Sequence, residues 1–148
     1  MKLLFFHLSY FSIAFSTAFI ILVIVWMNYP YKLIEWSGIS SPIVTKTIKQ
    51  GGIVKYKSDY CKYTDIQPTV TRIFKNGILF YTPTTIGATT KGCFNTTIAV
   101  PIPPELPPGK YILINIYDYK VNPVRSIKLT RRTDEFIVIE ATDSSQIK

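Results

Sequence analysis

The residues that could do chemistry in this chain are few, and their types exclude most catalytic and metal sites. The single histidine, His7, lies in a long apolar segment, so no Ser-His-Asp or Cys-His arrangement can form in the rest of the chain. No glycine-rich phosphate loop follows a predicted strand and opens a helix. A carboxylate-only mechanism would need two acidic side chains across a cleft, and the available candidates are Asp59, Asp65, Asp118, Asp134 and Glu135. Alanine at Asp59 and Asp118 would test it. Carboxylates on the wet face of a sheet are usually only solvated, so we expect no enzymatic activity, metal ion or cofactor.

The two cysteines, Cys61 and Cys93, are a second candidate for chemistry. They do not form a C-x-x-C arrangement, and two thiols alone cannot make a structural zinc site. We therefore expect one disulfide between them, which would close a loop of about 32 residues and contribute about 3–4 kcal/mol of stability. The alternative is a pair of buried thiols in a reducing compartment.

Basic side chains are a third candidate, because 17 lysine and arginine residues outnumber 9 acidic ones and give a net charge of +8. Most of them are scattered, which is typical of an evenly charged surface. The densest cluster, a candidate contact surface, consists of Arg125, Lys128, Arg131 and Arg132. It has two interpretations: contact with anionic lipid or an acidic partner, or a charged sheet edge that discourages aggregation.

Nucleic-acid binding is not expected, although residues 55–63 interleave basic and aromatic side chains. In a strand, Tyr56 and Tyr60 point to the face opposite Lys55 and Lys57. The tyrosines therefore pack in a core, and the lysines face solvent. They do not share one surface that could stack bases and neutralise phosphates.

The first element that positions these residues is an apolar segment over residues 3–27, which carries no charge. A helix of about 20 apolar residues crosses a bilayer core of roughly 30 Å, so we expect residues 1–31 to form a transmembrane helix in contact with membrane lipid. Trp26, Tyr29 and Tyr31 suit an aromatic belt at the water interface. The segment is longer than the core of a cleaved signal peptide and no A-x-A site follows it, which indicates an uncleaved signal anchor.

The orientation of this anchor follows from the cysteines and not from charge. Lys2 lies on one side of the segment and Lys32, Lys46 and Lys49 lie on the other, so the positive-inside count is indecisive. A disulfide requires an oxidising compartment, which favours a C-terminal domain outside the cytoplasm, in the periplasm of a bacterial host.

After the anchor, the pattern predicts a juxtamembrane linker over residues 32–42, a β domain over 43–140 and a flexible tail over 141–148. Runs of alternating apolar and polar residues recur between turn signals, and Asn76-Gly77 between two such runs is a strong hairpin signal. The predicted strands cover residues 43–49, 53–60, 69–74, 78–81, 93–101, 111–119, 126–132 and 136–140.

Seven or eight short strands predict an all-β fold, an immunoglobulin-like antiparallel β-sandwich preceded by one N-terminal transmembrane helix. Residues 101–109 hold five prolines, which favours a rigid corner between two sheets over a polyproline ligand for an aromatic groove. Tyr111 follows this corner, and we expect it to be a corner tyrosine whose hydroxyl bonds to nearby backbone. The expected bridge departs from the immunoglobulin pattern, because it joins the end of the second strand to the start of the fifth.

Several short motifs occur together in the predicted β domain. They are Asp59-Tyr60-Cys61-Lys62-Tyr63-Thr64, Thr69-Val70-Thr71-Arg72, Gly92-Cys93, Leu106-Pro107-x-Gly109-x-Tyr111 and Val121-Asn122-Pro123-x-Arg125. In these motifs the chain resembles small membrane proteins of tailed bacteriophages that pair an apolar N-terminus with an immunoglobulin-like β domain. The resemblance implies this architecture over nearly the whole chain and implies no activity, because that group has no assigned function.

The sequence therefore predicts a non-enzymatic, single-pass membrane protein that displays a β-sandwich outside the cytoplasm for contact with a protein partner. In a phage setting, the protein would act at the host envelope. The alternative is a structural or decoration component of a virion, with the apolar N-terminus buried in the assembly. A third hypothesis, an envelope-acting enzyme, requires the carboxylate-only mechanism.

Overall fold

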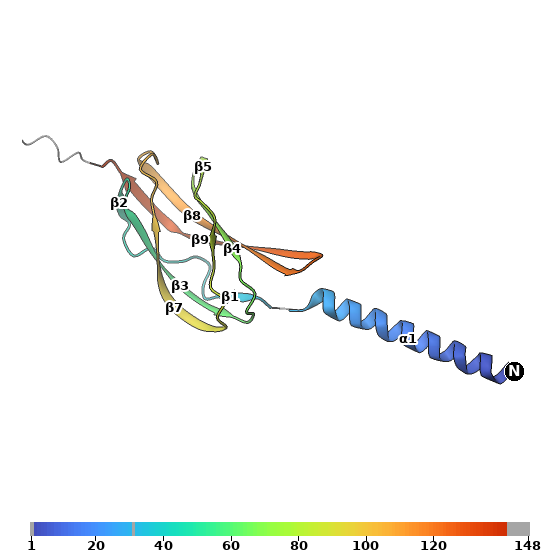
Figure 1. The fold of residues 1–148 in the computed structure, drawn as a ribbon. Helices are drawn as coiled ribbons and strands as arrows, with labels where there is room; N and C mark the ends of the chain where they lie inside the picture. The colour runs from blue at the N-terminus through green and yellow to red at the C-terminus, as the bar shows by residue number, and fades with distance from the viewer. Residues whose placement is uncertain (1, 31, 142–148) are drawn as a thin grey trace, which may run out of the picture.

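The computed structural model describes residues 2–30 and 32–141, with side chains from residue 10 onward. The described residues form one helix, α1 (Lys2–Asn28), and nine strands, and the helix projects from one end of the β domain (Figure 1). The His7 side chain, Tyr31 and the predicted tail over residues 142–148 lie outside this description.

Helix α1 is long and apolar enough to cross a membrane, as the sequence predicted. Its described apolar side chains are exposed except Val23, which is half-buried, so the β domain does not cover the helix. Thr17 Oγ1 donates to the carbonyl oxygen of Ile13 at 2.9 Å, so this polar side chain is satisfied within the helix.

The strands form two sheets that pack face to face (Figure 1). The small sheet has the order β1 (Ile34–Trp36), β3 (Ile53–Lys62) and β7 (Gly92–Pro101). The large sheet has the order β2 (Thr47–Lys49), β9 (Arg125–Ile139), β8 (Gly109–Asn122), β4 (Thr69–Asn76) and β5 (Ile78–Tyr81), and β6 (Thr85–Ile86) also pairs with β4. Neighbouring strands run antiparallel, except that β2 and β9 run parallel. The mostly β, two-sheet fold after one apolar helix is therefore confirmed.

The apolar core lies between the sheets at the end away from α1, which we call the distal end. Its rings include Phe74 and Phe136, which meet edge to face with centroids 6.2 Å apart. The core consists of Ile48, Val54, Tyr56, Phe74, Val100, Ile102, Leu106, Tyr111, Leu113, Phe136 and Val138. The opposite end of the sandwich, which we call the proximal end, lies beside α1 and has a more polar interior.

The proline-rich corner and its tyrosine are confirmed. Residues 102–108 connect β7 of the small sheet to β8 of the large sheet. The Tyr111 hydroxyl donates to the Pro107 carbonyl oxygen at 2.8 Å, and the tyrosine is buried. The predicted hairpin at Asn76-Gly77 also forms, with Gly77 at a φ of 64° between β4 and β5.

The structure differs from the predicted domain boundary in the juxtamembrane segment. Residues 32–42 were expected to be a linker, but they contain β1, which pairs with β3 from Ile34 opposite Lys62 to Trp36 opposite Tyr60. Ser41 then bridges to Thr133 of β9. The β domain therefore begins near Leu33, because the backbone of this aperiodic segment is hydrogen-bonded by strands distant in the sequence.

The two strands predicted over residues 126–132 and 136–140 are one continuous strand, β9. The Thr133-Asp134-Glu135 segment, expected to separate them, is an irregularity in the pairing with β8: Ile112 lies opposite Glu135 and Ile114 opposite Arg132. The Thr133 hydroxyl accepts a hydrogen bond from the Leu113 amide at 3.1 Å. A β-bulge therefore absorbs the polar residues without ending the strand.

Candidate contact surfaces

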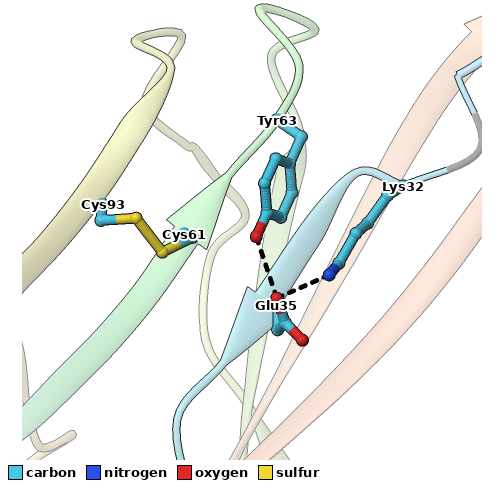
Figure 2. The surroundings of a disulfide bond; sticks show 5 residues. All are labelled: Lys32, Glu35, Cys61, Tyr63 and Cys93. Atoms are coloured by element: carbon cyan, nitrogen blue, oxygen red, sulfur yellow. Dashed lines mark hydrogen bonds and ion pairs between the residues drawn. A yellow bond between two sulfur atoms is a disulfide. The ribbon is translucent and has the colours of Figure 1, made fainter.

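The segment that leaves α1 is attached to β3 by three exposed side chains (Figure 2). Lys32 Nζ lies 2.6 Å from Glu35 Oε2, and the Tyr63 hydroxyl donates to the same oxygen at 2.9 Å. The hydrogen bond between Lys32 and Glu35 raises the pKa of the lysine and lowers the pKa of the carboxyl. Exposed ion pairs contribute little to stability, so this cluster chiefly orients the chain that connects the helix to β1.

Cys61 and Cys93 lie directly opposite each other on β3 and β7, and their sulfur atoms are 2.00 Å apart (Figure 2). This is a disulfide distance, as the sequence predicted. The pair links two neighbouring strands of the small sheet at its proximal end and does not join the two sheets.

The four basic residues predicted as one contact surface are separated by the fold. Arg125 is at the tip of the β8–β9 hairpin and donates from Nη1 to the Met27 carbonyl oxygen, 2.9 Å away, at the C-terminal end of α1. Lys128 lies 3.8 Å from Asp118 Oδ2 on the outer side of the large sheet. Arg132 is exposed on the same outer side. Arg125 therefore contacts the helix, and only Lys128 and Arg132 share an accessible face.

Arg131 does not belong to an accessible surface, because its side chain is 7% exposed. Its guanidinium donates to the carbonyl oxygens of Ser37, Gly38 and Ser40 at 2.9, 2.7 and 2.6 Å. Its Nε donates to Ser41 Oγ at 3.1 Å. Burial lowers the pKa of this guanidinium below its ordinary value. Arg131 therefore fastens the segment between β1 and β2 to β9, a role that the basic cluster in the sequence could not reveal.

An apolar patch on the outer side of the large sheet is a further candidate surface of the β domain. We call it the isoleucine face, and it consists of Ile73, Leu79, Tyr81, Ile112, Ile114 and Ile116. Strand pairing places Tyr81, Ile73, Ile114 and Arg132 in one row across β5, β4, β8 and β9. Leu79 and Tyr81 are exposed, the isoleucines of β8 are half-buried, and Ile73 is buried beneath its neighbours at 6% exposure.

Basic side chains lie within and beside the isoleucine face, and Lys75 stands between Leu79 and Ile112 in the strand pairing. A shallow hollow of about 530 Å³ is lined by Ile112 and Ile114 together with Lys75, Lys110 and Arg132. The one acidic residue in its lining is Glu135, which lies 3.6 Å from Lys110 Nζ. The sequence carried a signal for this face, because β8 is apolar at successive positions and not only at alternate ones, a pattern typical of a strand covered on both sides.

The outer side of the small sheet is polar by comparison. Its strand pairs place Lys57 opposite Thr97 and Asp59 opposite Asn95, and these side chains are exposed. Within the described residues, no group of three or more histidine, cysteine, aspartate or glutamate side chains could hold a metal ion. Asp59 and Asp118, two of the carboxylates considered for catalysis, lie on different sheets, and Asp118 is beside Lys128.

Comparison of the sequence with protein-family models and with curated protein sequences finds no match. The function is therefore inferred from these surfaces and from the apolar helix.

Proposed function

We propose that this protein is a single-pass, membrane-anchored β-sandwich module that binds a protein partner outside the cytoplasm. The isoleucine face is the observation that carries the proposal. Large apolar areas rimmed by polar residues mark interaction sites on soluble domains. This one lies on the outer side of the large sheet, with Lys110 and Arg132 beside it and Lys75 between Leu79 and Ile112. The matching partner surface is a protein with an apolar centre and an acidic rim.

The strand connectivity supports an immunoglobulin-like assignment. In a constant-type sandwich the first, second, fifth and fourth strands form one sheet, and the last, sixth and third strands form the other. Here β1, β3 and β7 correspond to the first, second and fifth strands, and β9, β8 and β4 correspond to the last, sixth and third. β5 pairs with β4 in the large sheet, so it does not take the place of the fourth strand beside β7. Tyr111 stands at the start of β8, where the corner tyrosine of this fold lies. The Cys61–Cys93 pair remains a departure, because it lies within one sheet.

The cysteine pair supports the placement outside the cytoplasm, because disulfides persist in oxidising compartments. The intact chain should be expressed in a bacterium and its thiols trapped with a maleimide polymer in denaturant, with and without prior reduction. We expect labelling only after reduction. Two thiols that react without reduction would contradict this placement.

Site-specific photo-crosslinking tests the contact surface. A photoreactive residue at position 114, at the centre of the isoleucine face, should give a discrete cross-linked product in the envelope fraction. The same photoreactive residue at position 57, in place of Lys57 on the outer side of the small sheet, is the control and should give no such product.

Charge reversal at the rim, Lys110→Glu with Arg132→Glu, should reduce the yield at position 114 about tenfold, since complementary rim charge speeds association. Equal yields from both positions, or no effect of charge reversal, would contradict the proposal.

The resemblance to tailed-phage membrane proteins extends this proposal to a phage-encoded protein that acts at the host envelope. The alternative role, a virion decoration component, is favoured by the same exposed apolar helix, which could be buried in an assembly instead of a bilayer. Fractionation separates the two. A membrane-anchored protein resists carbonate extraction from membranes, whereas a virion component sediments with purified particles.

A further inference from the structure

A cavity lies between the two sheets at the proximal end of the sandwich, and we call it the proximal cavity. It has a volume of about 250 Å³, roughly the space of eight liquid water molecules. Its lining comes from β1, β3 and β7 of the small sheet and from β4, β6 and β8 of the large sheet. The apolar core fills only the distal end of the sandwich, so this space is a separate feature of the interior.

Aromatic rings form much of the wall of the proximal cavity. Trp36 from β1 and Tyr117 from β8 lie with ring centroids 5.4 Å apart, and Tyr60 and Tyr119 also line the space. Burial raises the pKa of Tyr117 far above its ordinary value and raises that of Tyr119 to about 12. These hydroxyls are therefore neutral at physiological pH and add no negative charge to the cavity.

The charged residues that line the proximal cavity are both cations. Lys62 is 3% exposed, and its Nζ donates to the Ala88 carbonyl oxygen at 2.6 Å. Arg72 donates from Nη1 to Thr85 Oγ1 at 2.7 Å. No aspartate or glutamate is among the described residues that line the cavity, and Asp65, the carboxylate that influences Lys62, lies 3.6 Å from Lys91.

Two buried N–H groups of the lining residues have no acceptor among the described residues. They are the indole Nε1 of Trp36 and the Nε of Arg72. Buried donors in proteins nearly always find an acceptor, so two such groups among the residues that line one cavity are unusual. A bound group with several oxygen atoms and a negative charge would satisfy both donors and balance both cations.

We infer that the proximal cavity binds a phosphate ester, with the phosphate at Arg72 and Trp36 and the organic part against the aromatic walls. A phosphate offers more acceptor oxygens and more charge than a carboxylate, which fits two cations and two free donors. This inference does not depend on the isoleucine face, which lies on the outer side of the large sheet.

Two sources could supply this chemistry. One is a free phosphate ester of small size, which the cavity volume accommodates. The other is the headgroup of an anionic phospholipid, because β1 begins six residues after the last residue of α1 and brings Ile34 and Trp36 to the end of the domain beside the helix.

Fluorescence titration of the full chain in dodecyl maltoside micelles tests the inference. The chain has two tryptophans, so Trp26→Phe leaves Trp36 as a single reporter in the cavity wall. One arm adds glycerol 3-phosphate. The other adds dioctanoyl phosphatidylglycerol, with dioctanoylglycerol as the matched lipid that lacks phosphate. We expect a saturable change in Trp36 emission with one or both phosphate compounds and none with dioctanoylglycerol.

Two variants distinguish a specific phosphate-binding site from non-specific attraction of anions to a basic protein. Arg72→Gln should weaken binding at least tenfold, whereas Lys57→Gln, which removes one positive charge from the outer side of the small sheet, should leave it unchanged. If Arg72→Gln does not fold, Trp36→Phe followed by calorimetry serves instead, because it removes the N–H and keeps an aromatic ring at this position. Binding of the lipid alone identifies a headgroup, and binding of glycerol 3-phosphate identifies a soluble ligand. The inference is wrong if neither compound binds, if glycerate binds as tightly, or if Lys57→Gln and Arg72→Gln have equal effects.

Discussion

Arg131 and Arg132 are adjacent in the sequence but have opposite environments. Strand alternation turns Arg131 inward to the backbone of residues 37–41 and turns Arg132 outward to the rim of the isoleucine face. Position along a strand therefore decides whether a basic residue is structural or available to a partner.

Replacing Arg131 should cost far more stability than replacing Arg132. Arg131→Leu leaves the carbonyl oxygens of Ser37, Gly38 and Ser40 without their donor, and we expect a loss of about 2–4 kcal/mol in the free energy of unfolding. Arg132→Leu should change it by less than about 0.5 kcal/mol, since it is an exposed site. Urea unfolding followed by Trp36 fluorescence measures both, and similar losses for the two variants would contradict the assigned role.

The buried tyrosines predict a decline of stability at alkaline pH. Burial holds the pKa of Tyr119 at about 12, above the ordinary 10.0, so folding favours the protonated hydroxyl. The resulting stabilisation is complete below pH 10 and is lost as the pH rises through 12. Tyr119→Phe should make the free energy of unfolding fall less steeply over this range. Tyr81→Phe, at an exposed tyrosine, should follow the wild-type curve, and a Tyr119→Phe curve that also does so would refute the prediction.

At the scale of elements, strands with a local signal could be predicted from the sequence. The alternation in β3 and the Asn76-Gly77 hairpin are local patterns, and both appear where expected. β1 has no such pattern because residues 32–42 are ordered by distant partners, namely β3 and Arg131. The continuity of β9 could not be predicted either. The polar residues Thr133 and Asp134 indicate a break between two strands unless the pairing with β8 is known.

The candidate sites also differed in whether the sequence alone could reveal them. The cysteine pairing could be predicted because the chain offers only two cysteines. The proximal cavity could not, since its walls come from six strands and its two cations, Lys62 and Arg72, belong to different sheets.

Removal of the Cys61–Cys93 link should lower stability without changing the strand pairing. The linked residues are separated by 32 positions, and a loop of this length corresponds to about 3–4 kcal/mol in the chain-entropy description. The Cys61→Ser, Cys93→Ser double variant should show this loss in urea unfolding, and reduction of the wild type should reproduce it. Circular dichroism should show an unchanged β signal, and a loss of that signal would mean that the link is needed to form the sheet.

At the scale of the whole molecule, α1 and the β domain are largely independent. The described side chains of α1 are exposed except Val23, and the hydrogen bond from Arg125 to the Met27 carbonyl joins the helix to the β8–β9 hairpin. We therefore expect a chain lacking residues 1–31 to be released from membranes with its β domain folded. Its free energy of unfolding should lie within about 1 kcal/mol of the value for Arg125→Ala in the full chain, since both lack that hydrogen bond. A domain that unfolds on removal of the helix would show that α1 is part of the fold.

The parallel pairing of β2 with β9 has a mechanical consequence. The chain enters the domain beside α1 and leaves it from the end of β9 at the distal end (Figure 1). Tension between a fixed helix and a load at the distal end would slide the segment over residues 41–50 along β9. The hydrogen bonds between them, including those from Asp134 to Ser41 and from Ile137 to Lys46, run across the direction of pull and would have to break together. A domain connected in this way resists stretching more strongly than one whose end strands separate one hydrogen bond at a time.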